Sequence, residues 1–248
     1  LGDDAIITNS GNITGADDGI DSRGDNAIIT NSGRIDAGDD GIYSNGANTT
    51  ITNSGIIDVD DEGINSDAAN AIITNSGTID AEDDGISSDG VNAIITNSGR
   101  IDAGDDGIVS DGANAIITNS GRIDADDDGI SSFGADATIT NSGTIDAADV
   151  GIQSFGADAT ITNSGTITGT NYAITGGASD SLTLNLLKGS QLMGAIDLGG
   201  AGAMDNDTVN IHGGSVSATL TFLNTENINL LGPGLKLSGD VVVSVDGT

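Results

Sequence analysis

The sequence is poor in the residues that usually stabilise a core of this size. Its 248 residues include no cysteine or tryptophan, one proline, two tyrosines and three phenylalanines. The lack of cysteine excludes disulfide bonds, although it is compatible with secretion because a long repetitive core needs no cross-link. Few aromatics with high charge would normally indicate disorder, but a strict spacing of isoleucine from Ile7 to Ile174 opposes that interpretation.

Positive charge and long apolar runs are equally scarce. Six basic residues face 38 acidic ones, so the formal net charge is −32. Such acidity argues against nucleic acid and anionic membrane surfaces as partners. No apolar run reaches the length of a membrane span.

Five residues, Ile-Thr-Asn-Ser-Gly, recur at a fixed interval through the first two thirds of the chain. The eight copies follow a 22-residue period, without insertion or deletion, and begin at Ile7, Ile29, Ile51, Ile73, Ile95, Ile117, Ile139 and Ile161. A fixed period of this size is typical of a solenoid, in which each repeat is one structural unit stacked on the next. We therefore predict a regular array over residues 1–170.

Three isoleucine positions recur in every repeat and define the predicted coil. The three ladders start at Ile7, Ile13 and Ile20 and recur with the same period up to Ile161, Ile167 and Ile174. Around each isoleucine, apolar residues alternate with Thr, Asn, Ser and Asp, which indicates short β-strands. Abundant Gly, Asn and Asp oppose helix. The sequence predicts an all-β, triangular parallel β-helix with a 22-residue coil and three strands per coil.

An asparagine also recurs in every repeat, and stacked side-chain amides can hydrogen-bond along the axis of such a fold. We predict a structural turn ladder at Asn9, Asn31, Asn53, Asn75, Asn97, Asn119, Asn141 and Asn163.

Beyond residue 170 the pattern changes, because larger side chains replace the isoleucines and acidity falls. Residues 171–248 are predicted to form irregular coils and a C-terminal cap, which would cover an otherwise exposed sheet edge.

The C-terminal sequence carries a family resemblance. The run LTLNLLKGSQLMGAIDLGG, followed by DNDTVNIHGG and ENINLLGPGLKLSGDVVVSVDGT, resembles the end of the secreted passenger of bacterial autotransporters, the type V secretion proteins. The upstream ITNSGTIDA repeats resemble the passenger repeats, so the resemblance covers the whole chain. It implies a right-handed β-helix at a Gram-negative cell surface. It also implies an outer-membrane translocator barrel as partner beyond Thr248, which this sequence does not contain, and we expect further chain before Leu1.

Pairs of acidic residues precede a glycine in successive repeats, and we call them the acidic turn row. Stacking brings like charges about 4.8 Å apart, which costs roughly 0.9 kcal/mol per neighbouring pair in bulk water and about four times more near a protein surface. Calcium prefers carboxylate and carbonyl oxygens. We therefore predict calcium between coils at Asp17, Asp18, Asp39, Asp40, Asp61, Glu62, Asp83, Asp84, Asp105, Asp106, Asp127 and Asp128. The alternative is a solvated acidic face screened by salt.

A second row of carboxylates, the acidic strand row, recurs at the same interval. It comprises Asp36, Asp58, Asp80, Asp102, Asp124 and Asp146. Arg34, Arg100 and Arg122 are too few to neutralise these charges. Neither row matches the calcium-binding nonapeptide or an EF-hand loop, so the metal hypothesis depends on the stacking alone.

Two other functions compete with a structural one. A polysaccharide-acting β-helix enzyme would need clustered carboxylates at one distinct cleft, whereas these acids are equivalent in nearly every repeat, and the single His212 has no recognisable partner. An ice-binding face would use the ladder from Thr8 to Thr162, although ordinary strand surface with good β propensity explains that ladder better. We expect a non-enzymatic structural or adhesive protein outside a Gram-negative cell, acting as a stiff stalk or self-assembling fibre subunit.

Overall fold

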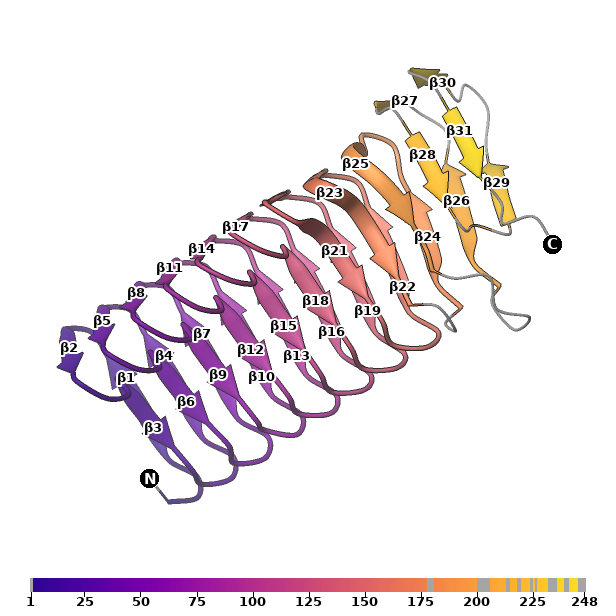
Figure 1. Ribbon diagram of the computed structural model, residues 1–248. Coiled ribbons are helices and arrows are strands. Elements are labelled where there is room, and N and C mark those ends of the chain that lie inside the picture. The colour runs from indigo at the N-terminus through magenta and orange to yellow at the C-terminus, as the bar shows by residue number, and fades with distance from the viewer. Residues whose placement is uncertain are drawn as a thin grey trace.

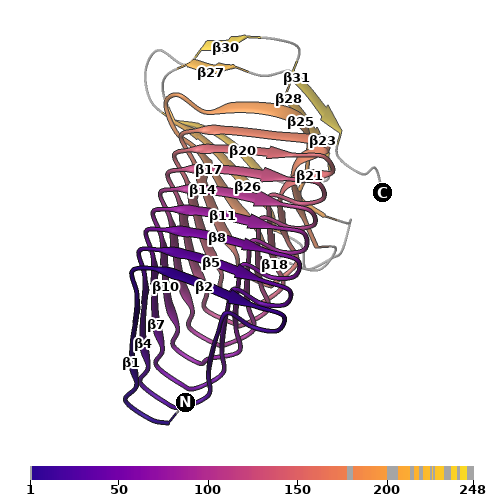
Figure 2. The ribbon, with the colours of Figure 1, turned by 90° about the vertical axis from the view of Figure 1, so that its left-hand side faces the viewer.

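A computed structural model describes residues 2–177, 181–199, 206–212, 215–217, 220–223, 225, 227–231, 236–238 and 241–244. In this part the chain is an all-β parallel solenoid of about nine turns with about 22 residues each, which confirms the predicted fold class. Figure 1 shows the coils stacked along one axis, and Figure 2 shows the same stack after a quarter turn. Parts of the predicted cap, among them residues 200–205, 232–235 and 245–248, lie outside the described residues.

Each regular coil contributes one strand to each of three faces. The first face comprises β1 (Ile6–Asn9), β4 (Ile28–Asn31), β7 (Thr50–Asn53), β10 (Ile72–Asn75), β13 (Ile94–Asn97), β16 (Ile116–Asn119), β19 (Thr138–Asn141), β22 (Thr160–Asn163), β24 (Thr183–Leu186), β26 (Thr208–His212) and β29 (Asn227–Leu231). The second face comprises β2 (Asn12–Gly15), β5 (Arg34–Ala37), β8 (Ile56–Val59), β11 (Thr78–Ala81), β14 (Arg100–Ala103), β17 (Arg122–Ala125) and β20 (Thr144–Ala147). The third face comprises β3 (Ile20–Ser22), β6 (Ile42–Ser44), β9 (Ile64–Ser66), β12 (Ile86–Ser88), β15 (Ile108–Ser110), β18 (Ile130–Ser132) and β21 (Val150–Ser154).

Strand register is constant through the regular array. On the first face Ile73 lies opposite Ile95, and Ile95 lies opposite Ile117. The second and third faces keep the same interval, with Ile79 opposite Ile101 and Ile86 opposite Ile108. Because the sequence interval equals the structural one, each side chain stacks on its own equivalent in the neighbouring coil.

The three isoleucine ladders fill the interior, as predicted. From the second coil onward their members have no exposed surface, whereas Ile7 and Ile13 in the first coil are only partly buried. Burying a side chain of this size contributes about 1.5–3 kcal/mol. The core is therefore a continuous aliphatic column, which accounts for the near absence of aromatic residues.

Two asparagine ladders bind the coils together along the axis. In the predicted ladder, the Nδ2 group of each asparagine donates to the Oδ1 atom of the next, at 2.8–2.9 Å from Asn9 to Asn163. The second ladder, from Asn26 to Asn114, is exposed and was not predicted. Its members have positive φ, near 60° at Asn92. Asparagine and aspartate tolerate this left-handed conformation better than most residues.

Glycine is required where adjacent coils approach most closely. A Cβ atom on Gly99 would lie 2.1 Å from the carbonyl oxygen of Gly77, and the equivalent glycines meet the same obstacle. These glycines follow the buried asparagine by two residues, and their N–H groups donate to its Oδ1 atom. The Asn-Ser-Gly sequence is therefore the corner at which coil meets coil.

The coil changes after the regular array. The second and third strands merge into β23 (Thr166–Gly176), which pairs with both β20 and β21. On the first face the stacked positions are no longer evenly spaced, because the interval in sequence changes to 23, then 25, then 19. The last strands are β25 (Gln191–Asp197), β27 (Ser215–Ser217), β28 (Leu220–Leu223), β30 (Lys236–Ser238) and β31 (Val241–Ser244).

Candidate metal-binding row

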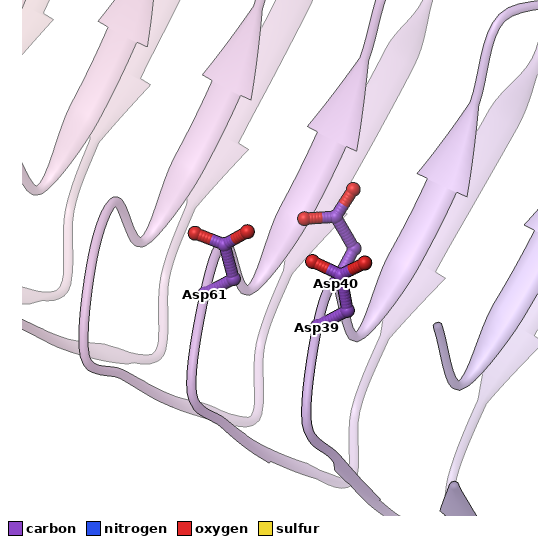
Figure 3. Close-up of side chains that lie close together, drawn as sticks. All are labelled: Asp39, Asp40 and Asp61. Carbon is purple, nitrogen blue, oxygen red and sulfur yellow. The ribbon is translucent and has the colours of Figure 1, made fainter. Parts of the chain in front are cut away.

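The acidic turn row lies at the corner between the second and third faces. In five successive places, the two acids of one turn and the first acid of the next turn bring carboxylate oxygens within 4.8 Å of one another. The clusters are Asp39–Asp40–Asp61, Asp61–Glu62–Asp83, Asp83–Asp84–Asp105, Asp105–Asp106–Asp127 and Asp127–Asp128–Asp149. Figure 3 shows the first of them, with Asp39 and Asp61 in equivalent positions on adjacent coils. Carboxylate clusters of this kind can hold metal ions.

Ten of the twelve predicted ligands lie in these clusters, and two do not. Asp17 and Asp18, in the first described coil, do not form such a three-carboxylate cluster with Asp39. Nothing in the structure explains why this coil differs. Asp149 joins the last cluster. It was not predicted, because Val150 replaces the second acid of its turn and the acidic pair is absent from the sequence there. The 22-residue register alone would have identified it.

Backbone hydrogen bonds hold the second acid of three successive turns. The Oδ1 atom of Asp84 accepts a hydrogen bond from the N–H of Asp106 at 3.0 Å, and Asp106 Oδ1 accepts one from the N–H of Asp128 at 2.8 Å. Asp128 Oδ1 accepts the N–H of Val150 at 3.0 Å. Each carboxylate therefore bridges to the next coil. Asp40 differs, because its Oδ1 atom is buried and accepts no hydrogen bond.

Three arginines form ion pairs with the other row. Arg100 pairs with Asp102 at 2.5 Å, and Arg122 pairs with Asp124 at 2.6 Å. Arg34 bridges Asp36 and Asp58. All of these partners belong to the acidic strand row, and no ion pair within residues 2–177 reaches the acidic turn row. The turn row is therefore left without the arginine ion pairs that the strand row has.

Burial and crowding raise the pKa values of several turn carboxyls. Burial, and next Glu62, raises the pKa of Asp40 to about 8. Burial and the Asp39 carboxyl raise the pKa of Asp61 to about 7. Burial is also the main cause at Asp84, whose pKa rises to about 7, and at Asp128, whose pKa rises to about 6. Near neutral pH these carboxyls are therefore partly protonated, unless a bound cation replaces the protons.

We expect the metal-free protein to lose stability as pH rises from 5 to 8.5. A carboxyl whose pKa is higher folded than unfolded stabilises the fold while it is protonated, and that contribution disappears as pH rises through the folded pKa. The affected groups titrate between about 6 and 8 in the fold and near 4 when unfolded. Thermal melts in chelator should show the fall. Asp84→Asn should raise the melting temperature at pH 8.5 more than at pH 5, and an unchanged profile would contradict the assignment.

An open depression lies on the second face beside the turn row. Its volume is about 450 Å³, and Asp80, Glu82, Asp102 and Asp126 line it together with Gly104. Glu82, Gly104 and Asp126 occupy one position of the repeat, so the glycine leaves a space between two acidic side chains. The depression offers acidic side chains for a cation or a polar ligand.

The first face carries the isoleucine and threonine stripe on which the ice-binding alternative depends. Ile28, Ile72, Ile94 and Ile116 are 40–46% exposed, and the threonines from Thr30 onward are half-buried. Apolar side chains therefore contribute more of the outer surface than the threonine ladder does. Ice binding stays a prediction.

Comparison with known protein families, with curated proteins and with solved structures finds no significant match. No helix among the described residues is long and apolar enough to cross a membrane.

Proposed function

We propose that this protein is an extracellular structural rod of a Gram-negative bacterium, stabilised by calcium, that acts as an adhesive stalk or a fibre subunit. The main support is the equivalence of successive coils, which keep one register from β1 to β22. Repetition supports reach and multiple weak contacts. A catalytic centre instead needs one place where its groups differ from their surroundings.

The acidic turn row supports the calcium part of the proposal. Each of the five clusters offers three carboxylates within 4.8 Å, and no ion pair among residues 2–177 reaches the row. A bound divalent cation would remove repulsion along the row and link one coil to the next. Calcium fits better than magnesium because it accepts six to eight oxygens in irregular geometry.

The test of the structural role is electron microscopy of the purified chain in millimolar calcium and in chelator. Ordered filaments in calcium alone would identify a cation-assembled fibre, whereas separate rods in both conditions would identify a stalk. A parallel assay against acidic and neutral polysaccharides addresses the enzymatic alternative. Release of oligosaccharides by the purified chain would contradict the structural proposal.

Calcium is expected to raise the melting temperature by roughly 5–10 °C. One site filled at a hundred times its dissociation constant contributes about 2.7 kcal/mol, and each kcal/mol shifts the melting temperature of a chain of this size by about 2–4 °C. Melts at pH 7.5 in millimolar calcium, magnesium and chelator should separate the ions. Equal melting temperatures in all three would refute calcium stabilisation.

A further inference from the structure

One turn in the acidic row departs from the repeat. The second acid of each turn from Asp18 to Asp128 is aspartate except at Glu62, whose side chain is one methylene longer. The departure coincides with the loss of a hydrogen bond. Asp84, Asp106 and Asp128 each accept an N–H from the residue 22 positions later, but Asp40, which precedes Glu62 by 22, has an Oδ1 atom without a hydrogen-bond partner.

The buried Asp40 carboxyl lies close to other carboxyls. Asp40 is only 6% exposed, and one of its oxygens lies within 4.8 Å of those of Asp39 and Asp61. Figure 3 shows the three side chains gathered at one corner of the coil. Glu62 borders the cluster, because it forms the next cluster with Asp61 and Asp83 and its carboxyl contributes to the raised pKa values of Asp40 and Asp61. Carboxylate oxygens this close repel one another unless a proton or a cation lies between them.

We propose that Asp39, Asp40, Asp61 and Glu62 form a single calcium site of higher affinity than the other clusters of the acidic turn row. The proposal rests on the calcium-stabilised rod proposed above and identifies where that rod first binds the ion. Four carboxylates supply up to eight oxygens, which matches the coordination of calcium and exceeds what the octahedral magnesium ion needs. The buried Oδ1 atom of Asp40 has no hydrogen bond to lose when it binds the ion. The Oδ1 atom of Asp84, in contrast, already accepts a hydrogen bond from the backbone and must share that oxygen with the ion.

Calorimetric titration of the whole chain with calcium chloride, in a buffer containing millimolar magnesium, tests the site. We expect one tight event at one ion per chain, followed by weaker binding. Asp40→Asn should weaken the tight event by about tenfold or more, since ligand charge sets calcium affinity. Glu62→Asp keeps every negative charge and restores the repeat. It should merge the tight event with the weak class, because Asp40 can then bond to the next coil as Asp84 does.

Asp106→Asn is the matched comparison, because Asp106 occupies the same turn position and accepts a backbone hydrogen bond. It should reduce the weak binding and leave the tight event in place. Circular dichroism of each variant in chelator verifies that it remains folded. Equal and weak binding at all clusters, or a tight event that survives Asp40→Asn, would overturn the site while leaving calcium stabilisation intact. No binding by the native chain would refute both proposals.

Discussion

Removal of one whole coil, residues 92–113, is expected to leave the rod folded, whereas removal of half a coil, residues 92–102, should destroy its cooperative unfolding. After the whole-coil deletion, Val91 precedes Asn114, which occupies the position that Asn92 held. The buried amide of Asn75 then lies below Asn119 instead of Asn97, and each isoleucine ladder closes over the gap. Nearest-neighbour contacts dominate the stability of repeat proteins, so the loss of one internal repeat changes little.

The half-coil deletion removes β13 and most of β14 but keeps β15. The shortened coil cannot pass around all three faces, so strands of different faces are forced into register. Melting curves, limited proteolysis and electron microscopy measure the outcome. The 22-residue deletion should shift the melting temperature by a few degrees and shorten the rod by about 4.8 Å. Equal protease sensitivity of the two deletions would show that the coils are not interchangeable.

Asn97→Asp is expected to destabilise the protein by about 3–5 kcal/mol, the scale of an uncompensated buried charge. Asn97 has no exposed surface. Its Nδ2 group donates to Asn119 Oδ1 at 2.9 Å, and its Oδ1 atom accepts from Asn75 Nδ2 at 2.9 Å. An ionised aspartate replaces the donor with a second acceptor that faces Asn119 Oδ1, and that oxygen keeps only the N–H of Gly121 as a donor. Thermal melts at pH 7.5 should show a drop of roughly 10 °C or more.

Asn92→Asp provides the matched control for this prediction. Asn92 begins the same coil and its amide also stacks on an equivalent, donating to Asn70 Oδ1 at 2.9 Å, but this ladder is exposed. Aspartate already occupies the same left-handed position at Asp136 and Asp158. The control should therefore change the melting temperature little. Lowering the pH should partly restore the melting temperature of Asn97→Asp, since a protonated carboxyl can donate a hydrogen bond again. Equal melting temperatures of the two variants would contradict the role of the buried ladder.

The regular coil could be predicted from the sequence because the period of the sequence equals the period of the structure. The interval between copies of Ile29 is the interval between coils, so a ladder in the sequence is a ladder in space. The alternation around each isoleucine identified which side chains point inward. The exposed asparagine ladder was missed because aspartate replaces asparagine at this position in some coils, as at Asp136 and Asp158. The positive φ that these residues share has no direct signature in the residue pattern.

The candidate site was predicted less completely. Stacking identified the acidic turns, but not how the carboxyl groups turn within them. Glu62 replaces the aspartate of the other turns, and this conservative change does not interrupt the acidic pattern of the sequence. In the structure it accompanies the unbonded oxygen of Asp40. Arg100 and Arg122 lie between two acidic rows in the sequence, and only the fold shows that both serve the strand row.

The perpendicular arrangement of strands and rod axis has a mechanical consequence. A pull on the two ends would peel coils away one at a time, because each coil is held mainly by hydrogen bonds parallel to the force. A detached coil releases a 22-residue segment, which extends to roughly 75 Å, whereas it occupied only about 4.8 Å of the rod. Under tension the molecule would therefore lengthen more than tenfold in discrete steps, dissipating the load at the coils that yield while the remaining coils keep their shape.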